Sequence, residues 1–266
     1  MRVLIVASLF TPWRLGGAEV VAESSARALA DLGHEVHVLT LSPDQETSED
    51  GQGGYRVRRI PLFNIYSLQD MNRATTIQRV QWHIKDRYNN AMRIAFSKEL
   101  KMIQPDVVLL HNIAGFSISI YDALTRVSTP FFQVLHDHYF SCVYSTMYRN
   151  SKTCEVQCLR CNFMRKRNFK TTQRANGVIG VSNFILNRIK SIGYFSGVPS
   201  KVIQNLSSQP PKKEFSDEFF QKKFKLGCTL GYLGILTESK GVLDLIHAFK
   251  KTAGPFDSLR LAGHLD

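Results

Sequence analysis

Apolar runs along the chain alternate with segments whose apolar residues recur at helical spacing. The run RVLIVAS (Arg2–Ser8) has no polar alternation, which predicts a strand buried on both faces. From Gly17 to Leu32 apolar residues recur every three or four positions, and Gly33 follows, so this segment predicts a helix with a glycine after its end. Buried strands that alternate with helices predict an α/β fold, a Rossmann-like parallel sheet with helices on both faces.

The same alternation continues along the chain. It predicts strands at Glu35–Leu41, Tyr55–Ile60, Asp106–His111, Pro130–Asp137, Gly177–Ser182 and Lys201–Asn205. It predicts helices at Thr76–Ile103, Ser117–Arg126, Phe163–Ala175 and a segment that ends at Ile192. The polar segment Asp44–Gly54 is expected to be an exposed loop. In the longest helix, a repeat of four residues predicts an inward-facing stripe of Ile84, Tyr88, Met92 and Phe96.

A polar segment with two prolines, Ser207–Glu218, predicts a linker between two domains. The first domain would comprise residues 1–206 and the second residues 219–266. The second begins with one strand–helix–strand pattern at Cys228–Leu236, Gly241–Lys251 and Ser258–His264. Parallel strands need helices on both faces, and one such unit cannot supply them, so we expect the second Rossmann-like domain to be truncated.

Composition and charge narrow the class of partner. The chain has 266 residues, 44% of them hydrophobic, and a net charge of +12. Such a basic balance favours nucleic acid, acidic lipid or a phosphorylated substrate, although a basic surface without a specific partner fits equally. The five cysteines are few for a disulfide scaffold, and no run of about 18 apolar residues occurs. We therefore expect a cytoplasmic protein with reduced thiols.

Gly16 and Gly17 follow the first strand after a short loop and open the first helix. Glycine permits positive φ and lets a backbone approach a ligand closely, and a helix start directs free N–H groups and a positive dipole at that point. The corner fits a phosphate or a hydroxyl-rich ligand, although a plain tight turn would also use glycine. Glu19 in the first turn would complement the dipole. A dinucleotide fingerprint is disfavoured because its third glycine is missing.

Several segments occur in an order and spacing that resembles the family 4 glycosyltransferases: GGAE, HEVHVLT, PDVVLLHN, VLHDHYFSC, GVIGVS and KVIQNL. The later segment LGYLGILTESKGVLDLIHAF is similar to the opening of the family's C-terminal domain. The resemblance covers essentially the whole chain. It implies the GT-B architecture, in which two Rossmann-like domains hold a nucleotide-sugar between them. It also implies sugar transfer with retention and with no cofactor or metal for catalysis.

The resemblance implies a donor side built from both domains. Gly16 and Gly17 match the glycine loop that approaches the donor, and His136 matches a histidine that reaches the donor sugar and would be catalytic. Lys240 matches a lysine that binds the donor diphosphate, but Ile235 stands where the family commonly has an arginine. The paired glutamates of the family (E-x7-E) would lie beyond Asp266. We therefore expect this chain to be a fragment with little activity of its own.

The acceptor side is expected at the carboxyl ends of two neighbouring strands. His111 and Asn112 end one strand, and Asp137 follows the next beside His136. Ligand groups in α/β sheets lie at such strand ends, so these three residues are candidate acceptor contacts. The acceptor would be a glycan or a lipid-linked sugar of a surface polysaccharide, lipopolysaccharide or glycolipid.

Four cysteines occur in a short irregular segment, at Cys142, Cys154, Cys158 and Cys161. Four thiolates can hold a structural zinc ion or an iron–sulfur cluster. Reduced cysteines packed in a small core explain the same pattern, and both interpretations stay open.

The segment Arg160–Lys170 concentrates positive charge, with Phe163, Met164 and Phe169 between the basic residues. As a helix it could lie on the anionic inner face of a membrane, contact a nucleic-acid backbone, or simply pack its apolar side on the sheet. Three functions follow from the sequence: a nucleotide-sugar-dependent glycosyltransferase, a non-catalytic acceptor-binding half that needs a partner chain for the donor, and a zinc-stabilised nucleic-acid binder. The first is favoured, and nucleic acid is the disfavoured partner.

Overall fold

The computed structural model describes residues 1–13, 16–44, 46–205 and 227–263. The chain divides into two compact units. The first comprises Met1–Met147 and Cys154–Leu206, and the second comprises Tyr148–Thr153 and Ser207–Asp266. The linker expected at Ser207–Glu218 lies outside the described residues.

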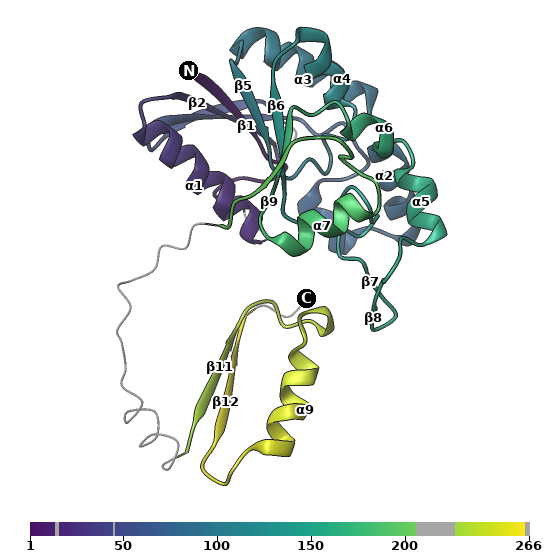
Figure 1. The fold of residues 1–266 in the computed structure, drawn as a ribbon. Helices are drawn as coiled ribbons and strands as arrows, with labels where there is room; N and C mark the ends of the chain where they lie inside the picture. Colours follow the sequence, from purple (N-terminus) through teal and green to yellow (C-terminus); the bar gives the residue numbers. More distant parts are fainter. Residues whose placement is uncertain (14–15, 45, 206–226, 264–266) are drawn as a thin grey trace. The chain divides into compact units, whose positions relative to one another are not determined.

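The first unit is built on a mostly parallel sheet (Figure 1), in which the described residues form eight strands in the order β10-β9-β6-β5-β1-β2-β4-β3. Only β3 runs antiparallel to its neighbour. At the centre, Val3 of β1 pairs with Val36 of β2 on one side and with Val107 of β5 on the other. The strands are β1 (Arg2–Val6), β2 (Glu35–Leu41), β3 (Ser48–Gln52), β4 (Tyr55–Ile60), β5 (Val107–Leu110), β6 (Phe131–Leu135), β9 (Gly177–Gly180) and β10 (Ser200–Val202).

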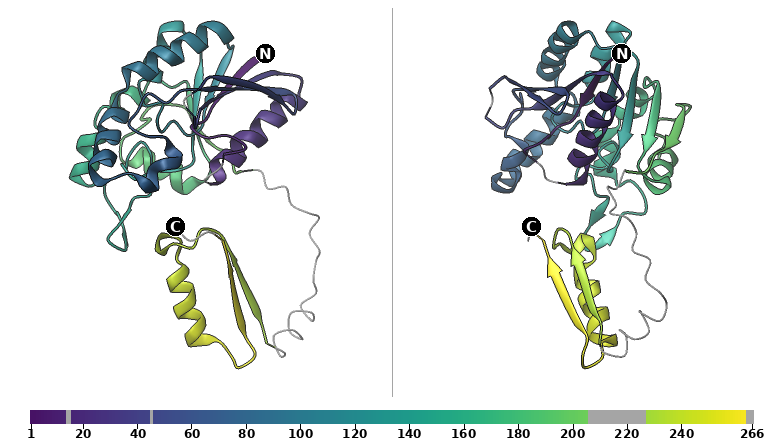
Figure 2. Two further views of the ribbon diagram at one scale, coloured as in Figure 1. Left: turned by 180° about the vertical axis from the view of Figure 1, so that it is seen from behind. Right: turned by 90° about the vertical axis from the view of Figure 1, so that its left-hand side faces the viewer.

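Helices lie on both faces of this sheet, as the sequence predicts (Figures 1 and 2). α1 packs on one face, whereas α3, α4 and α7 contribute to the core on the other. A 3₁₀ helix, η1 (Leu68–Arg73), precedes α2, and a small hairpin of β7 (Tyr148–Arg149) and β8 (Lys152–Thr153) lies in the cysteine segment. The helices are α1 (Gly17–Asp31), α2 (Thr76–Arg87), α3 (Asn90–Ile103), α4 (Ile120–Val127), α5 (Leu159–Arg165), α6 (Asn168–Thr172) and α7 (Asn183–Ser191).

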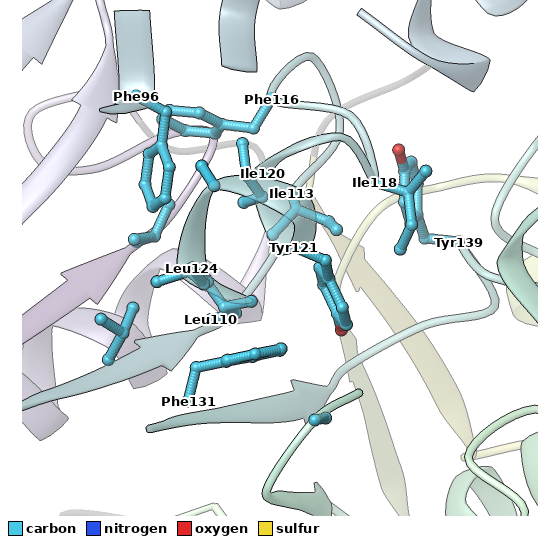
Figure 3. Close-up of a cluster of buried hydrophobic side chains, with 14 of the residues drawn as sticks. Phe96, Leu110, Ile113, Phe116, Ile118, Ile120, Tyr121, Leu124, Phe131 and Tyr139 are labelled. Carbon is cyan, nitrogen blue, oxygen red and sulfur yellow. The ribbon is translucent and has the colours of Figure 1, made fainter. Parts of the chain in front are cut away.

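The larger core lies under α3 and α4, where aromatic rings fill the space above the strands (Figure 3). Tyr121 of α4 and Phe131 of β6 are buried, with ring centroids 4.8 Å apart at a near-perpendicular angle. Phe96 of α3 meets Phe116 in the same way, at 6.2 Å. Burial of such large rings contributes strongly to the stability of this unit.

α1 covers only part of its face of the sheet. Its core joins Ala22 and Ala26 of α1 to β1, β2 and β4. Beyond α1, the outward side chains of β5, β6 and β9 border a groove of about 270 Å³. The groove is lined mainly by apolar atoms, and Leu109, Val134 and Ile179 form its floor.

The expectation of a loop at Asp44–Gly54 is wrong, because Ser48–Gln52 forms β3 along the edge of the sheet. Gly53 and Gly54 take positive φ (51° and 85°), the conformation that a tight hairpin turn needs. Glu49 pairs with Arg58 at 3.2 Å, and Asp50 pairs with Arg59. A charged edge strand does not show the apolar alternation by which strands are recognised.

The single helix expected over Thr76–Ile103 is two helices. Tyr88 is extended (φ −160°, ψ 105°), and Asn89 caps α3 by accepting a hydrogen bond from the Met92 N–H at 3.1 Å. The apolar repeat of four residues runs through this break. Met92 and Phe96 are buried as expected, but Ile84 is 57% exposed, so its expected inward orientation is wrong.

The basic segment is also divided, into α5 and α6. Arg165 and Asn168 lie at the division, and both side chains are buried. Asn168 donates from its amide nitrogen to the Phe140 carbonyl at 3.2 Å, which ties the division to the loop after β6.

The second unit has a simple pattern in its described residues. β11 (Thr229–Leu233) and β12 (Ser258–Ala262) pair in parallel, and η2 (Glu238–Lys240) and α9 (Val242–Thr252) connect them. The strand–helix–strand pattern predicted here is therefore formed. Gly241, with φ 75°, separates η2 from α9.

Candidate functional site

The strand order of the first unit turns at β1 and β5. The crossover through α1 leads from β1 to β2 on one side, and the crossover through α4 leads from β5 to β6 on the other. In open α/β sheets the crevice at the carboxyl ends of strands at such a point is where ligands bind. The loops after β1 and β5 are joined there, because the Ser8 hydroxyl lies 2.8 Å from the Asn112 carbonyl oxygen and 2.6 Å from that of Ala114.

One N–H group at the start of α1 is bound by a side chain of the same helix. The buried Glu19 carboxylate accepts the Gly16 N–H at 2.8 Å, so it acts as a cap in addition to complementing the dipole. Gly16 is extended, with φ −163°, so its backbone does not require glycine. What the two glycines leave is space. Among the described residues, a Cβ on Gly16 would meet only a Glu19 oxygen at 3.8 Å, and one on Gly17 would meet nothing within 4 Å.

Two histidines follow β5 and β6 and touch each other. His111 Nδ1 lies 3.0 Å from His136 Nε2, and the rings stack with centroids 5.2 Å apart. They meet because β5 and β6 are neighbours in the sheet and each histidine comes directly after its strand. Gln133 supports the pair: it accepts from the Tyr121 hydroxyl at 2.9 Å and donates to the His111 carbonyl at 2.7 Å.

His111 is the inner member of this pair. It is 3% exposed, and its Nε2 has no hydrogen-bond partner among the described residues. The expected direct contact of His111 with an acceptor does not fit such burial. The geometry instead makes His111 a support for His136, since a hydrogen bond to one ring nitrogen determines which tautomer the other ring adopts.

Both imidazoles are uncharged at neutral pH. Burial lowers the pKa of His111 to about 3, helped by its neighbour, and lowers the pKa of His136 to about 4. A neutral His136 can donate or accept one hydrogen bond to a hydroxyl, but it holds no proton to release as an acid near pH 7. A cavity of about 10 Å³ lies beside the pair, next to Asn112 and Asp137.

Asp137 is the acidic group of this edge. Burial raises its pKa to about 6, while a hydrogen bond from the Tyr139 N–H at 2.8 Å and the Arg165 charge act in the opposite direction. The Glu19 carboxylate also raises the pKa of Asp137, so the start of α1 and the end of β6 are within electrostatic reach of each other. Asn112 is less available, since its side-chain oxygen accepts the Ala114 N–H at 3.0 Å.

A buried polar network behind this edge was missed by the sequence analysis. Asp86 of α2 accepts from the Tyr139 hydroxyl at 2.9 Å and from the Gly115 N–H at 2.8 Å, and Arg165 lies 3.5 Å from it. The Arg165 guanidinium also covers the Tyr139 ring, 4.3 Å from its centroid. The available signal was a lone acid in a helix that is otherwise neutral or basic.

The structure therefore brings five of the expected residues, together with His111 behind them, to one edge of the sheet: Gly16, Gly17, Asn112, His136 and Asp137. Lys240 belongs to the second unit, where it ends η2 with an exposed side chain. Ile235, at the position of the expected arginine, lies between β11 and η2.

The four cysteines gather into a small apolar cluster. Cys142 and Cys161 are buried with Met147, and Cys154 and Cys158 pack against them. A hydrogen bond from Cys161 lowers the pKa of the Cys142 thiol to about 5. In the part of the chain that the structure describes, no group of three or more His, Cys, Asp or Glu side chains is arranged to hold a metal ion. The thiols pack and hydrogen-bond with one another in this structure, and the metal centre considered for these cysteines stays a prediction.

Comparison with known sequences identifies related proteins. The sequence model of Glycosyltransferase Family 4 matches residues 15–206. The chain is also 23% identical, over 273 residues, to an uncharacterized 42.6 kDa protein in the cps region of Klebsiella pneumoniae. That alignment covers 97% of this chain and 69% of the relative.

Solved structures share the fold. HepE of Anabaena in complex with UDP superimposes with a TM-score of 0.58 at 16% identity, over 100% of this chain and 62% of HepE. The catalytic domain of starch synthase IV from Arabidopsis thaliana, bound to ADP and acarbose, gives 0.58 at 15% identity, over 99% and 68% of the two chains. Sucrose-phosphate synthase from Thermosynechococcus elongatus gives 0.57 at 9% identity, over 100% and 71%. The chain thus spans 62% of the length of HepE.

Proposed function

The chain belongs to Glycosyltransferase Family 4, and on that premise we propose that it transfers a sugar from a nucleotide-sugar donor to a glycan or lipid-linked acceptor. We propose that transfer retains the configuration of the sugar and serves the synthesis of a surface polysaccharide or glycolipid. The relative in a cps region supports this pathway, and the neighbours bound to UDP and ADP support a nucleotide-sugar donor. In this proposal, residues 1–206 bind the acceptor and residues 219–266 begin the donor-binding domain.

The observation that carries the proposal is the paired imidazole at the switch point of the sheet. His136 Nε2 is engaged with His111 at 3.0 Å, which leaves Nδ1 of His136 for a hydrogen bond to the transferred sugar. A neutral imidazole in a desolvated position can orient a sugar hydroxyl, and the bond strengthens as charge develops on the sugar. His111 acts on the reaction through His136 and is a positioning residue.

The donor phosphates need positive groups. The N-terminus of α1 supplies N–H groups and a helix dipole, and the open space above Gly16 and Gly17 admits a ligand to them. Lys240 would add a charge from the second domain. Asp137 and Asn112 would contact the acceptor. With its pKa of about 6, Asp137 is largely ionised near pH 7 and accepts hydrogen bonds from acceptor hydroxyls.

Substitution of His136 tests this function. A protein that joins this chain to a complete donor-binding domain, given radiolabelled UDP- and ADP-sugars and a membrane lipid extract, should transfer label, and His136→Ala in that protein should lower kcat by about 100-fold or more. His34→Ala is the matched control, because His34 precedes β2 at the opposite edge of the sheet. Circular dichroism verifies the fold of both variants. Undiminished transfer by His136→Ala, or no transfer with any donor, would contradict the proposal.

A second candidate is an acceptor-binding half that works with a partner chain. Leu230 and Leu233 of β11 are 44% and 88% exposed, which leaves apolar strand surface for another polypeptide to cover. Calorimetric titration with UDP and ADP separates the two candidates. Micromolar binding by the chain alone favours the enzyme, whereas no binding together with intact acceptor binding favours the half.

A further inference from the structure

α2 presents apolar residues on the side that faces away from the protein. Trp82 and Asp86 form its buried face. Ile77, Val80 and Ile84 lie roughly opposite Trp82 on the helix, and they are 71%, 40% and 57% exposed. A surface helix ordinarily turns polar residues toward water. The outward stripe of α2 is apolar instead, which is unusual for a helix that faces only water.

Neighbouring elements extend this apolar surface. α5 packs against α2 (Figure 1), and the Arg87 guanidinium covers the Phe163 ring of α5 at 5.0 Å. Phe163 is 65% exposed and Leu159 is 88% exposed. Tyr144 stands beside α2, where its ring meets that of His83 at 6.1 Å. We call this the α2–α5 surface, and it consists of Ile77, Val80, Ile84, Tyr144, Leu159 and Phe163. Contiguous exposed apolar residues of this kind mark an interaction site.

Positive charge predominates on the two helices that carry the α2–α5 surface. The only acid of α2 is Asp86, which is fully buried, and α5 has no acid at all. The basic residues of the two helices and the turn after them, apart from the buried Arg165, are Arg79, Lys85, Arg87, Arg160, Lys166 and Arg167.

We propose that the α2–α5 surface binds the interface of an anionic lipid bilayer. Apolar side chains on one face of a helix, with lysine and arginine beside them, match the acyl boundary and the headgroups of such a membrane. In a symmetric dimer through this surface, the basic residues of one copy would face the basic residues of the other. This like-charge repulsion disfavours a second copy of the chain as the partner. No helix among the described residues is long and apolar enough to cross a bilayer, so the contact is peripheral.

The position of this surface suits a lipid-linked acceptor. Asp86, on the inward face of α2, accepts the Tyr139 hydroxyl at 2.9 Å, and Tyr139 follows Asp137 by two residues. A bilayer against the outward face of α2 therefore lies one helix away from the loop after β6. The inference itself concerns membrane binding and does not depend on sugar transfer.

Vesicle sedimentation of the full chain tests the inference. Neither donor nor acceptor is added, so the outcome is independent of the proposed enzymatic function. The native chain should sediment with phosphatidylcholine vesicles that contain phosphatidylglycerol, and at least about tenfold less with phosphatidylcholine alone. The triple variant Ile77→Gln, Val80→Gln, Ile84→Gln should lose about 100-fold in affinity for the anionic vesicles, since three aliphatic side chains no longer enter the interface.

Two further variants sharpen this experiment. Arg79→Gln with Lys85→Gln should lower affinity for anionic vesicles by about tenfold or more and leave binding to neutral vesicles unchanged. The matched control is Ile94→Gln, Met102→Gln, Val127→Gln, which removes exposed apolar residues from α3 and α4 (46%, 54% and 42% exposed) and should bind like the native chain.

Three results would overturn the inference: no vesicle binding by the native chain, equal binding to neutral and anionic vesicles, or undiminished binding by the α2 triple variant. Sedimentation velocity supplies one more. If the native chain is a dimer, the α2 variant a monomer and vesicle binding unchanged, the surface is an interface between copies of this chain.

Discussion

The carboxyl edge of the sheet and the α2–α5 surface reverse the usual distribution of polar and apolar groups in opposite ways. At the edge, His111, His136 and Asp137 are desolvated. Desolvation lowers the pKa of both histidines and raises the pKa of Asp137, so it favours the neutral form of each group. On the α2–α5 surface, Ile84 and Phe163 face solvent at 57% and 65% exposure. Each arrangement costs stability in the isolated chain.

The difference supports the two kinds of binding that we propose. Desolvated polar groups form strong directional hydrogen bonds, so the edge fits a small polar ligand such as a sugar. Exposed apolar groups with flanking charge have no directional requirement, so the α2–α5 surface fits an extended partner such as a bilayer. Asp86 joins the two regions, because it lies on the inward face of α2 and holds Tyr139 behind the edge.

The largest expected effect comes from removing the Asp86 carboxylate, which links the two regions. Asp86→Ala should lower the free energy of unfolding by about 3–5 kcal/mol, because it leaves the buried Arg165 guanidinium without its carboxylate. Urea denaturation followed by circular dichroism measures the loss. Asp70→Ala, an exposed acid of η1 with 51% side-chain exposure, is the control and should change stability by less than about 0.5 kcal/mol. A loss below about 1 kcal/mol for Asp86→Ala would mean that the network does not hold α2 in place.

The sequence predicted the architecture better than the polar details. Buried strands such as β2 and β4 have apolar patterns that local sequence expresses directly, and their bounds agree with the prediction. β3 was missed because its pairing comes from charged contacts across an edge. The end of α2 was missed because the apolar repeat continues through the break, where Asn89 caps α3.

The candidate site shows the same limit. The residues of the edge could be named because strand ends in a parallel sheet meet at one edge. That His111 lies behind His136, and that Asp86 pairs with Arg165, depends on side chains that are 25 and 79 positions apart in sequence. No local pattern reports such contacts.

The next expected effect is a loss of stability in acid. The pKa values of His83, His111 and His136 are about 4, 3 and 4, below the ordinary value of 6.5, so between these values the unfolded chain binds protons that the folded chain does not. The contribution of these three histidines is therefore full above about pH 7 and falls as the pH decreases. Asp137 opposes this, since its folded pKa of about 6 lies above the ordinary value and favours the folded state as the pH falls through 6.

The net loss from these four groups between pH 7 and pH 5.5 should be about 2–3 kcal/mol in urea denaturation. His111→Gln should remove about one proton from the difference between the unfolded and folded states, and so reduce the slope by about a third. His34→Gln, at the opposite edge of the sheet, is the matched control. An unaltered slope in His111→Gln would show that the pair is not held neutral by burial.

The smallest expected change in stability concerns the glycines at the start of α1. These glycines test whether the carboxyl edge of the sheet admits a donor. Gly17→Ala places a methyl group where no atom of the residues that the structure describes lies within 4 Å, and alanine favours a helix, so stability should change by about 0.5 kcal/mol or less. The effect on the donor should be larger: kcat/KM should fall about tenfold, because the methyl group occupies the approach to the N–H groups of α1. Gly51→Ala on β3 also meets nothing within 4 Å and should leave both quantities unchanged. Equal kcat/KM for Gly17→Ala and the native chain would mean that the open space at this edge does not admit the donor, and the desolvated histidines would then have to act on a sugar that arrives from another direction.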